Sequence, residues 1–430
     1  MRRIFLATFC VIALLTKTDT DSAHVMSRLG TVESIVERGT YRLDDSIFIR
    51  TVDKVFKDGH FYSHQPPLLS TLEAPVYWAL RLPGTRFNNR GRFVMIYAFS
   101  LLTNGIALAL TVIAFAAILA MAGVKPPLRE WAAVLLPMGT WLLPYGLVPN
   151  NHGIAGLLVA VLFWLLLTVE WQGATRRRAL AVGAVLGLLA GIEVLPIVSF
   201  VPLTVFYLLR RRDLDARGRV MFAAGLAVPL IAHGVINVSI TGDVLPAGFH
   251  PELFRYEGTF FEEAELTGTI KYTSVGAAAE YAWTSLFAHK GFFVFAPLTL
   301  LGLIAGTIER RWWLNRAGGV YAILMMGAAI SLTVSLLTTN NHGGEAVGFR
   351  HAVYLSPALI VLLLPWLMRE RTRLHHALVL IIAVTSTLSM LLFAVRQPWS
   401  VLTLNAAPIG SWEQYVPIVA RLVNGTLFSP

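Results

Sequence analysis

The residues best suited to chemistry stand in short polar stretches between long apolar runs. The stretch TKTDTDSAH, residues 16–24, places Asp19 and Asp21 two positions apart, directly after the first apolar run. A partly desolvated carboxylate can take the proton of a hydroxyl substrate, so either Asp could act as a general base. The alternative is an acidic helix boundary, in which an Asp caps the helix that follows. The spacing does not decide between these two interpretations.

A second polar stretch, NNHGGEAVGFRH at residues 340–351, is unusual in a chain with only 14% charged residues. Its paired Gly343 and Gly344 allow tight backbone conformations whose N–H groups can bind an anion. Arg350 is the one Lys or Arg of the stretch, and its guanidinium could bind a phosphate. The alternative is an Arg that reaches toward the phosphates of lipid headgroups. The other candidates for binding in this stretch are His342, Glu345 and His351.

Two histidines stand four positions apart in the stretch DGHFYSHQPPLLS, residues 58–70. On a helix, His60 and His64 could share a metal ion, but the Pro66-Pro67 pair and the glycine before His60 predict an extended turn. We therefore expect a turn at the membrane surface and no metal ion. The candidates for binding in this turn are His60, Tyr62 and His64.

The elements that must position these residues are membrane-spanning helices. The 430 residues are 56% hydrophobic and contain many apolar runs near twenty residues long, which predicts an all-α, polytopic membrane protein. The net charge of +10 does not imply nucleic acid as a partner, because Lys and Arg collect in the cytoplasmic loops of membrane proteins. The single cysteine, Cys10, excludes a disulfide framework and a cysteine-based zinc site.

About eleven crossings are expected from the apolar runs. The run 179–209 has three arginines at each end, so we expect a hairpin with both ends in the cytoplasm and a turn near residues 191–196. The first run is interpreted as an uncleaved helix rather than a signal peptide. The remaining spans are expected near 4–16, 93–122, 129–148, 153–171, 220–240, 287–308, 317–338, 352–368 and 377–395.

The positive-inside rule puts the amino terminus in the cytoplasm and nearly all unusual polar residues on the external face. This convergence makes His152 and Glu193, which are expected at helix ends, further candidates for binding. The chain is expected to be one membrane domain, residues 1–430, without a convincing internal repeat. Its external segments are 17–91, with amphipathic interfacial helices, 241–286, 339–351 and the tail 396–430.

Several short segments resemble bacterial members of the GT-C superfamily, multi-span glycosyltransferases related to the protein O-mannosyltransferases and the lipid A aminoarabinose transferase. Those enzymes pass a sugar from a polyprenyl-phosphate carrier to an acceptor at the external membrane face. The segments are the Asp pair in TKTDTDSAH, VERGTYRLDDS, DGHFYSHQPPLLSTLEAPVYW, His152 after the third span, the loop at His289-Lys290-Gly291 followed by FVFAPLTLLGL, and GGEAVGFRHAVYLSPAL.

The resemblance implies an inverting transfer in which Asp21, or else Asp19, deprotonates the acceptor hydroxyl. Arg350, with Lys290 and His64, would stabilise the departing lipid phosphate. It further implies a lipid-linked donor, surrounding membrane lipids, an acceptor lipid, glycan or protein, and no cofactor or metal. The expected location is the bacterial inner membrane, with the active site on the periplasmic face.

Two features depart from the family pattern. Gln65 stands where relatives often carry a Lys before the Pro-Pro turn, and only a short tail follows Arg396. A different function class also stays open, a transporter or a flippase for lipid-linked sugars without covalent chemistry. The helix centres are largely apolar, which is less typical of a carrier than of an enzyme with an external site.

Overall fold

The structure is a computed structural model in which most of the chain is described. The described residues are 2–20, 22–82, 84–87, 91–262, 272, 274–288, 290–339, 344, 346–368, 372–396, 399 and 411–427. Three of the candidate residues, Asp21, His342 and Glu345, lie outside these ranges.

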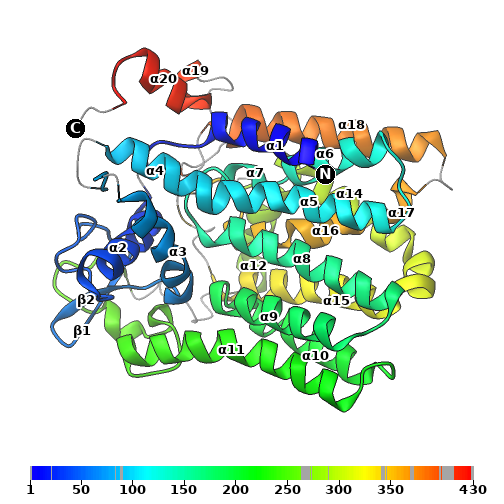
Figure 1. Ribbon diagram of the computed structural model, residues 1–430, viewed down its shortest axis with the longest axis horizontal. Helices are drawn as coiled ribbons and strands as arrows, with labels where there is room; N and C mark the ends of the chain where they lie inside the picture. The colour runs from blue at the N-terminus through cyan, green and yellow to red at the C-terminus, as the bar shows by residue number, and fades with distance from the viewer. Residues whose placement is uncertain are drawn as a thin grey trace.

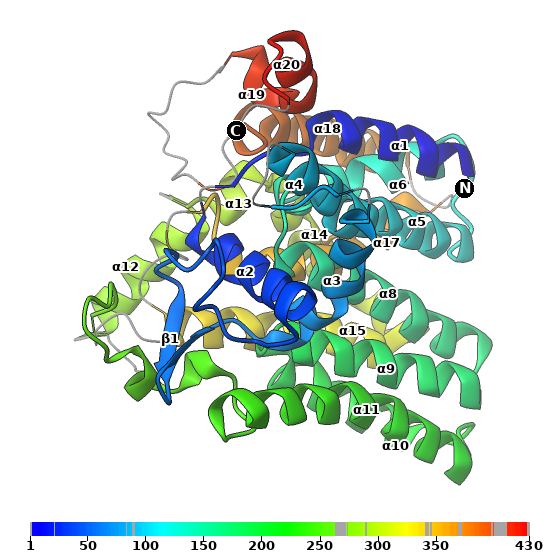
Figure 2. The same ribbon diagram turned by 60° about the vertical axis from the view of Figure 1, so that its left-hand side comes forward.

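Long helices lie side by side. The segment 17–91, which the sequence predicts to be external and which is called the first external segment below, packs at one end of them (Figures 1 and 2). The helices are α1 (Arg2–Leu15), α2 (Ala23–Arg38), α3 (Pro67–Leu80), α4 (Arg92–Ser100), α5 (Ile106–Met121), α6 (Leu128–Met138), α7 (Leu142–Tyr145), α8 (Asn151–Gln172), α9 (Arg176–Ile192), α10 (Phe200–Arg210), α11 (Ala216–Thr241), α12 (Val275–Leu286), α13 (Phe292–Phe295), α14 (Pro297–Ile308), α15 (Arg310–Thr338), α16 (Ser356–Val361), α17 (Leu364–Leu367), α18 (Arg373–Ser389), α19 (Trp412–Tyr415) and α20 (Pro417–Val423).

Five helical segments of the described chain are long and apolar enough to cross a membrane. Their length and composition confirm the predicted all-α, polytopic membrane architecture. The count of about eleven crossings stays a prediction, because several other apolar helices are shorter. The five segments are Arg92–Met121, Asn151–Gln172, Ala216–Thr241, Arg310–Thr338 and Arg373–Ala394.

The apolar run 179–209 forms two helices, α9 and α10, separated by a break that contains a 3₁₀ turn at Leu195–Ile197. The two basic ends of this segment lie together. Arg176 pairs with Asp215 at 2.5 Å, and Arg211 pairs with Glu170 at 2.9 Å. The expected hairpin is therefore present, with its turn at the end of the molecule that carries the first external segment (Figure 1).

Helices α9 and α11 approach each other closely at glycines, a feature common in membrane helix pairs. A Cβ on Gly187 would lie 2.5 Å from the carbonyl oxygen of Leu226, and one on Gly225 would overlap the carbonyl of Leu180. The amino termini of both helices are capped by side chains. Thr175 accepts from the N–H of Arg178, and Asp215 accepts from the N–H of Gly218.

The run 352–368 is not the single regular span that the sequence predicted. It contains a 3₁₀ segment at Arg350–Leu355 and the short helices α16 and α17. Residues 352–367 are all buried, so the run is enclosed by other helices, where irregular backbone at membrane depth is tolerated. The run 129–148 is likewise divided into α6 and α7. Uniformly apolar runs do not reveal such breaks.

The first external segment contains the two helices α2 and α3 and an antiparallel hairpin of β1 (Lys54–Lys57) and β2 (His60–Ser63). The hairpin register pairs Lys54 with Ser63 and Lys57 with His60. His60 and Tyr62 thus belong to an extended strand, as the proline pair suggested. Helix α2 buries Val25, Leu29 and Val32 in a cluster with residues of α3 and α4, which fixes its amino terminus beside the spanning helices.

Candidate functional site

A cavity of about 290 Å³ lies where the ends of several helices meet the first external segment. Its walls come from the start of α8, the end of α9, the end of α15 and the 3₁₀ segment that begins at Arg350. One part of the wall is polar, lined by His24, His64, Gln65, Asn151, His152, Glu193, Arg350 and His351. The other part is mainly apolar, lined by Pro66, Ile192, Val194, Leu195, Val198, Pro246, Gly248, Phe249, Val334, Ser335, Thr338 and Thr339.

Hydrogen bonds connect four polar side chains of this wall, which come from α2, the start of α8 and the end of α9. Asn151 Nδ2 donates to Glu193 Oε2 at 2.6 Å, and His152 Nδ1 lies 3.0 Å from the same oxygen. The Asn151 Oδ1 atom lies 3.1 Å from His24 Nε2. The rings of His24 and His152 are stacked, with centroids 6.0 Å apart and an interplanar angle of 11°. These contacts hold Glu193, the residue that directly follows α9, beside the first turn of α8.

Of the three residues Asn150, Asn151 and His152, the first has a structural role and the other two line the cavity. Asn150 caps α8, because its side chain accepts from the N–H of Gly153 at 2.9 Å. Asn104 fixes this cap from the neighbouring helix, donating to the carbonyl of Asn150 at 2.9 Å. Asn151 and His152 therefore begin the helix inside the cavity wall. Asn151, His24 and the wall residue Gln65 were not predicted as binding residues.

Arg350 is the one Lys or Arg among the residues that line this cavity. It has no hydrogen bond or ion pair in the part of the chain that the structure describes. Burial lowers the pKa of His24 and His351. The charges of Arg28 and, next, Arg350 lower the pKa of His24 further, and the charge of Arg350 lowers that of His351 further. Burial also lowers the pKa of His64. These three histidines are thus neutral near pH 7. Arg350 is the positively charged residue of the lining, and Arg28 lies behind the wall, where it donates to Gln65 Oε1 at 3.1 Å.

The loop before Arg350 is held by buried groups. Lys290, with only 2% of its surface exposed, donates from Nζ to the carbonyls of Gly344 at 2.6 Å and Ala346 at 2.7 Å. Tyr145 donates its hydroxyl to the carbonyl of Val347 at 2.8 Å. Lys290 does not line the cavity, so in this structure its ammonium positions the loop that carries Arg350.

Gly348 lies where this loop packs on Trp141, with a φ of +67°. A Cβ there would lie 2.8 Å from the indole ring, which is fully buried and donates Nε1–H to the carbonyl of Phe292. The spacing Gly-x-Arg therefore has a physical basis. The glycine permits the left-handed turn and the close contact, and the Arg two residues later enters the cavity wall.

We expect Gly348→Ala to destabilise the protein by about 2–5 kcal/mol, from left-handed backbone strain and overpacking together. Gly344→Ala is the matched control, because Gly344 has the same φ of +67° and nothing within 4 Å of an added Cβ. It should lose only the strain, about 1–2 kcal/mol. Thermal unfolding of both variants in detergent measures the difference. Equal stability of the two variants would contradict the tight contact with Trp141.

Of the three residues predicted to bind in the stretch 58–70, one lines the cavity and two do not. His64 lines the cavity, and its Nε2 lies 2.6 Å from Gln65 Nε2. His60 lies outside the lining, with Nδ1 3.3 Å from Asp44 Oδ2. Tyr62 is also outside it and pairs with Val55 in the hairpin.

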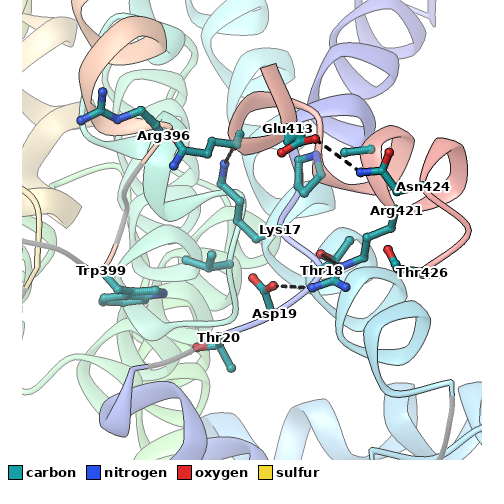
Figure 3. A pocket seen from close by; sticks show the side chains of 14 residues that line it. Lys17, Thr18, Asp19, Thr20, Arg396, Trp399, Glu413, Arg421, Asn424 and Thr426 are labelled. Atoms are coloured by element: carbon teal, nitrogen blue, oxygen red, sulfur yellow. Dashed lines mark hydrogen bonds and ion pairs between the residues drawn. The ribbon is translucent and has the colours of Figure 1, made fainter. Parts of the chain in front are cut away.

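Asp19 lines a second cavity, of about 560 Å³, between the end of α1 and the carboxy-terminal helices α19 and α20 (Figure 3). Arg421 of α20 donates to Asp19 Oδ2 at 2.8 Å and to Thr18 Oγ1 at 2.9 Å. Lys17 donates to the carbonyl of Gln414 at 2.6 Å, and burial lowers its pKa to about 8. The predicted base Asp19 is therefore bound to a residue of the tail and does not line the cavity of Arg350.

Trp399 lies between the two cavities. It lines the second cavity (Figure 3), and its ring centroid lies 6.2 Å from that of His24 and 5.5 Å from that of Tyr145. The chain passes from one cavity to the other within a few residues, because Thr20 lines the second cavity and His24 lines the first.

Comparison with solved structures identifies the architecture. The Archaeoglobus fulgidus oligosaccharyltransferase in its apo form matches with a TM-score of 0.52 and 11% sequence identity, over 94% of this chain and 56% of that one. Its complex with Zn and sulfate matches with a TM-score of 0.53 and 12% identity, over 94% and 54% of the two chains. The chain shares the fold of this oligosaccharyltransferase. It spans a little over half the length of the oligosaccharyltransferase, and so low an identity shows the fold alone.

A weaker match is the Cupriavidus metallidurans ArnT bound to undecaprenyl phosphate. Its TM-score is 0.48 and its identity 14%, over 99% of this chain and 72% of that one, and a TM-score below 0.5 does not by itself establish a shared fold. No protein-family model matches the sequence. No curated protein matches it either.

Proposed function

We propose that this chain is a membrane glycosyltransferase that moves a sugar from a polyprenyl monophosphate to an acceptor hydroxyl at the external membrane face. The observation that carries the proposal is Arg350, a cation without a partner in the described chain, in a cavity whose wall is polar on one side and apolar on the other. A guanidinium in such a wall can bind a phosphate through two parallel hydrogen bonds.

The apolar wall supports a lipid as the carrier. Val198 is 51% exposed and Phe249 is 39% exposed, and both line the same cavity as Arg350. A polyprenyl chain placed along these residues and Val334 would bury apolar surface while its phosphate reaches Arg350. A site for a free sugar nucleotide would not need this apolar side.

The proposed reaction is a single displacement. The acceptor oxygen loses its proton to a base and attacks the anomeric carbon, the bond from that carbon to the phosphate oxygen breaks, and the electron pair leaves with the lipid phosphate. Arg350 stabilises the charge that develops on the phosphate. Attack from the opposite side of the leaving group inverts the anomeric carbon.

For the base we propose Asp21, the residue favoured by the resemblance. Asp19 is the weaker candidate, since it is bound to Arg421. A carboxylate at position 21 follows Thr20 of the second cavity and precedes His24 of the first. We infer that the acceptor approaches from the side of the second cavity. His64 and His351 are proposed contacts of the donor, and the roles of His60, Tyr62, His342 and Glu345 stay predictions.

The acceptor class, the bacterial inner membrane as the location and the lack of a metal or cofactor also stay predictions.

Purified protein incubated with labelled polyprenyl-phosphate sugars and a membrane extract tests the proposal. We expect label to appear covalently on an acceptor and free polyprenyl phosphate to form in equal amount. Movement of the lipid-linked sugar across proteoliposomes without covalent transfer would contradict the enzyme and favour a flippase.

A further inference from the structure

His152 and Glu193 form a buried pair that phosphate binding does not explain. His152 is 3% exposed and Glu193 is 7% exposed, and both line the cavity that holds Arg350. The Nδ1 atom of His152 faces Glu193 Oε2 at 3.0 Å. Its other ring nitrogen, Nε2, is buried and has no hydrogen-bond partner in the described chain. A buried polar atom without a partner in a cavity wall is a site for a ligand group.

The hydrogen bonds determine which group Nε2 can bind. An ionised carboxylate only accepts hydrogen bonds, so Nδ1 of His152 carries the proton in its bond to Glu193. The amide of Asn151 donates to the same carboxylate oxygen, which leaves its Oδ1 to accept from His24 Nε2. In a neutral His152, Nε2 is then a hydrogen-bond acceptor. With His152 in this neutral form, the partner of Nε2 is a hydrogen-bond donor, such as a hydroxyl group.

We propose that His152, oriented by Glu193, binds a hydroxyl group of the donor's sugar ring and so selects neutral sugars. This inference rests on the proposed function. The sugar is bonded directly to the phosphate, and the residues that would bind the two groups share one cavity. His351 lines the same cavity, together with Arg350 and His152.

The pair also predicts which sugars are disfavoured. The acceptor Nε2 cannot donate to a carboxylate, and the negative charge of Glu193 lies behind it. A sugar carboxylate at this position would be desolvated next to a like charge and would find no donor on His152. We therefore expect neutral hexoses to be preferred over uronic acids.

Two ligands separate this inference from the proposed function. Binding of polyprenyl phosphate alone reports the phosphate contact, and binding of the same lipid phosphate carrying a neutral hexose adds the sugar contact. In His152→Phe we expect affinity for the bare lipid phosphate to stay within about twofold. Affinity for the hexose-bearing lipid should fall about 10-fold, the size of one lost buried hydrogen bond.

His233→Phe is the matched control, because His233 is a buried histidine that lines neither cavity, and it should leave both affinities unchanged. An equal loss for both ligands in His152→Phe, or no loss for either, would overturn the inference. Wild-type protein that binds neither ligand would overturn the proposed function as well.

Glu193→Gln provides a second variant should His152→Phe fail to fold. Removing the charge while keeping an amide oxygen for Asn151 and His152 should narrow the preference for a neutral hexose over a uronic acid by about 5- to 10-fold. The readout is competition between the two lipid-linked sugars for the purified protein. An unchanged preference in Glu193→Gln would contradict the role of the pair in selecting the sugar.

Discussion

Replacing Arg350 with Ala should lower the rate of sugar transfer by about 100- to 1,000-fold, because the departing phosphate would lose its charged hydrogen-bond donor. Binding of polyprenyl phosphate should weaken in the same variant, since a charge-assisted bond is lost from the ground state too. Transfer of label from a polyprenyl-phosphate sugar gives the rate, and titration with the bare lipid phosphate gives the affinity. No other Lys or Arg lines the described cavity to compensate.

Two control variants make this result specific. Arg350→Lys keeps the positive charge but lacks the planar guanidinium that can form two parallel hydrogen bonds to phosphate. It should therefore retain more transfer activity than Arg350→Ala. Arg176→Ala removes an exposed arginine that pairs with Asp215. It lies at the start of α9, whose other end lines the cavity, and its loss should leave transfer unchanged. Full transfer by Arg350→Ala would instead favour the interpretation in which Arg350 contacts lipid headgroups.

Replacing Asp21 with Asn should lower the transfer rate by about 100- to 10,000-fold, because the acceptor hydroxyl would lose its base. Binding of the lipid-linked donor should be unaffected, since Arg350 and His152 remain. Single-turnover measurements with donor prebound separate these two effects. The protein should stay folded, because Asn keeps the shape of Asp.

Asp19→Asn provides the comparison within the same polar stretch. Its carboxylate is 50% exposed and bound to Arg421, and an exposed ion pair contributes only about 0–1 kcal/mol. We therefore expect near-normal transfer in Asp19→Asn. A larger loss in this variant than in Asp21→Asn would reverse the assignment, and full activity in both would contradict a carboxylate base in this stretch.

The sequence predicted which polar residues lie on the same side of the membrane, but it did not predict which of them contact each other. Topology alone placed His64, His152, Glu193 and Arg350 on one side of the membrane, because the positive-inside rule orders every loop at once. The structure brings these four residues to one cavity. No local pattern pairs Asp19 with Arg421, since the two are 402 positions apart.

Three residues have contacts that the sequence did not predict. The resemblance implied that Lys290 helps to stabilise the phosphate, whereas in the structure its Nζ donates to two backbone carbonyls. His24 and Asn151 looked like ordinary flanking residues, because helix ends are often polar. Their part in the network depends on the packing of α2 against the start of α8, which has no periodic signature.

The apolar run 352–368 is divided into short helical segments, and hydropathy could not predict these breaks. An apolar run enclosed by protein and an apolar run facing lipid have the same composition, so both predict a straight span. Burial of residues 352–367 by neighbouring helices allows the break, and the 3₁₀ segment that results begins with Arg350.

An experimental structure of the protein with bound polyprenyl phosphate tests the central claim most directly. We predict the phosphate within hydrogen-bond distance of the Arg350 guanidinium, with the prenyl chain leaving the cavity past Val198 and Phe249. A phosphate bound instead beside Lys17 and Arg421 in the second cavity, with the cavity of Arg350 empty, would contradict the account.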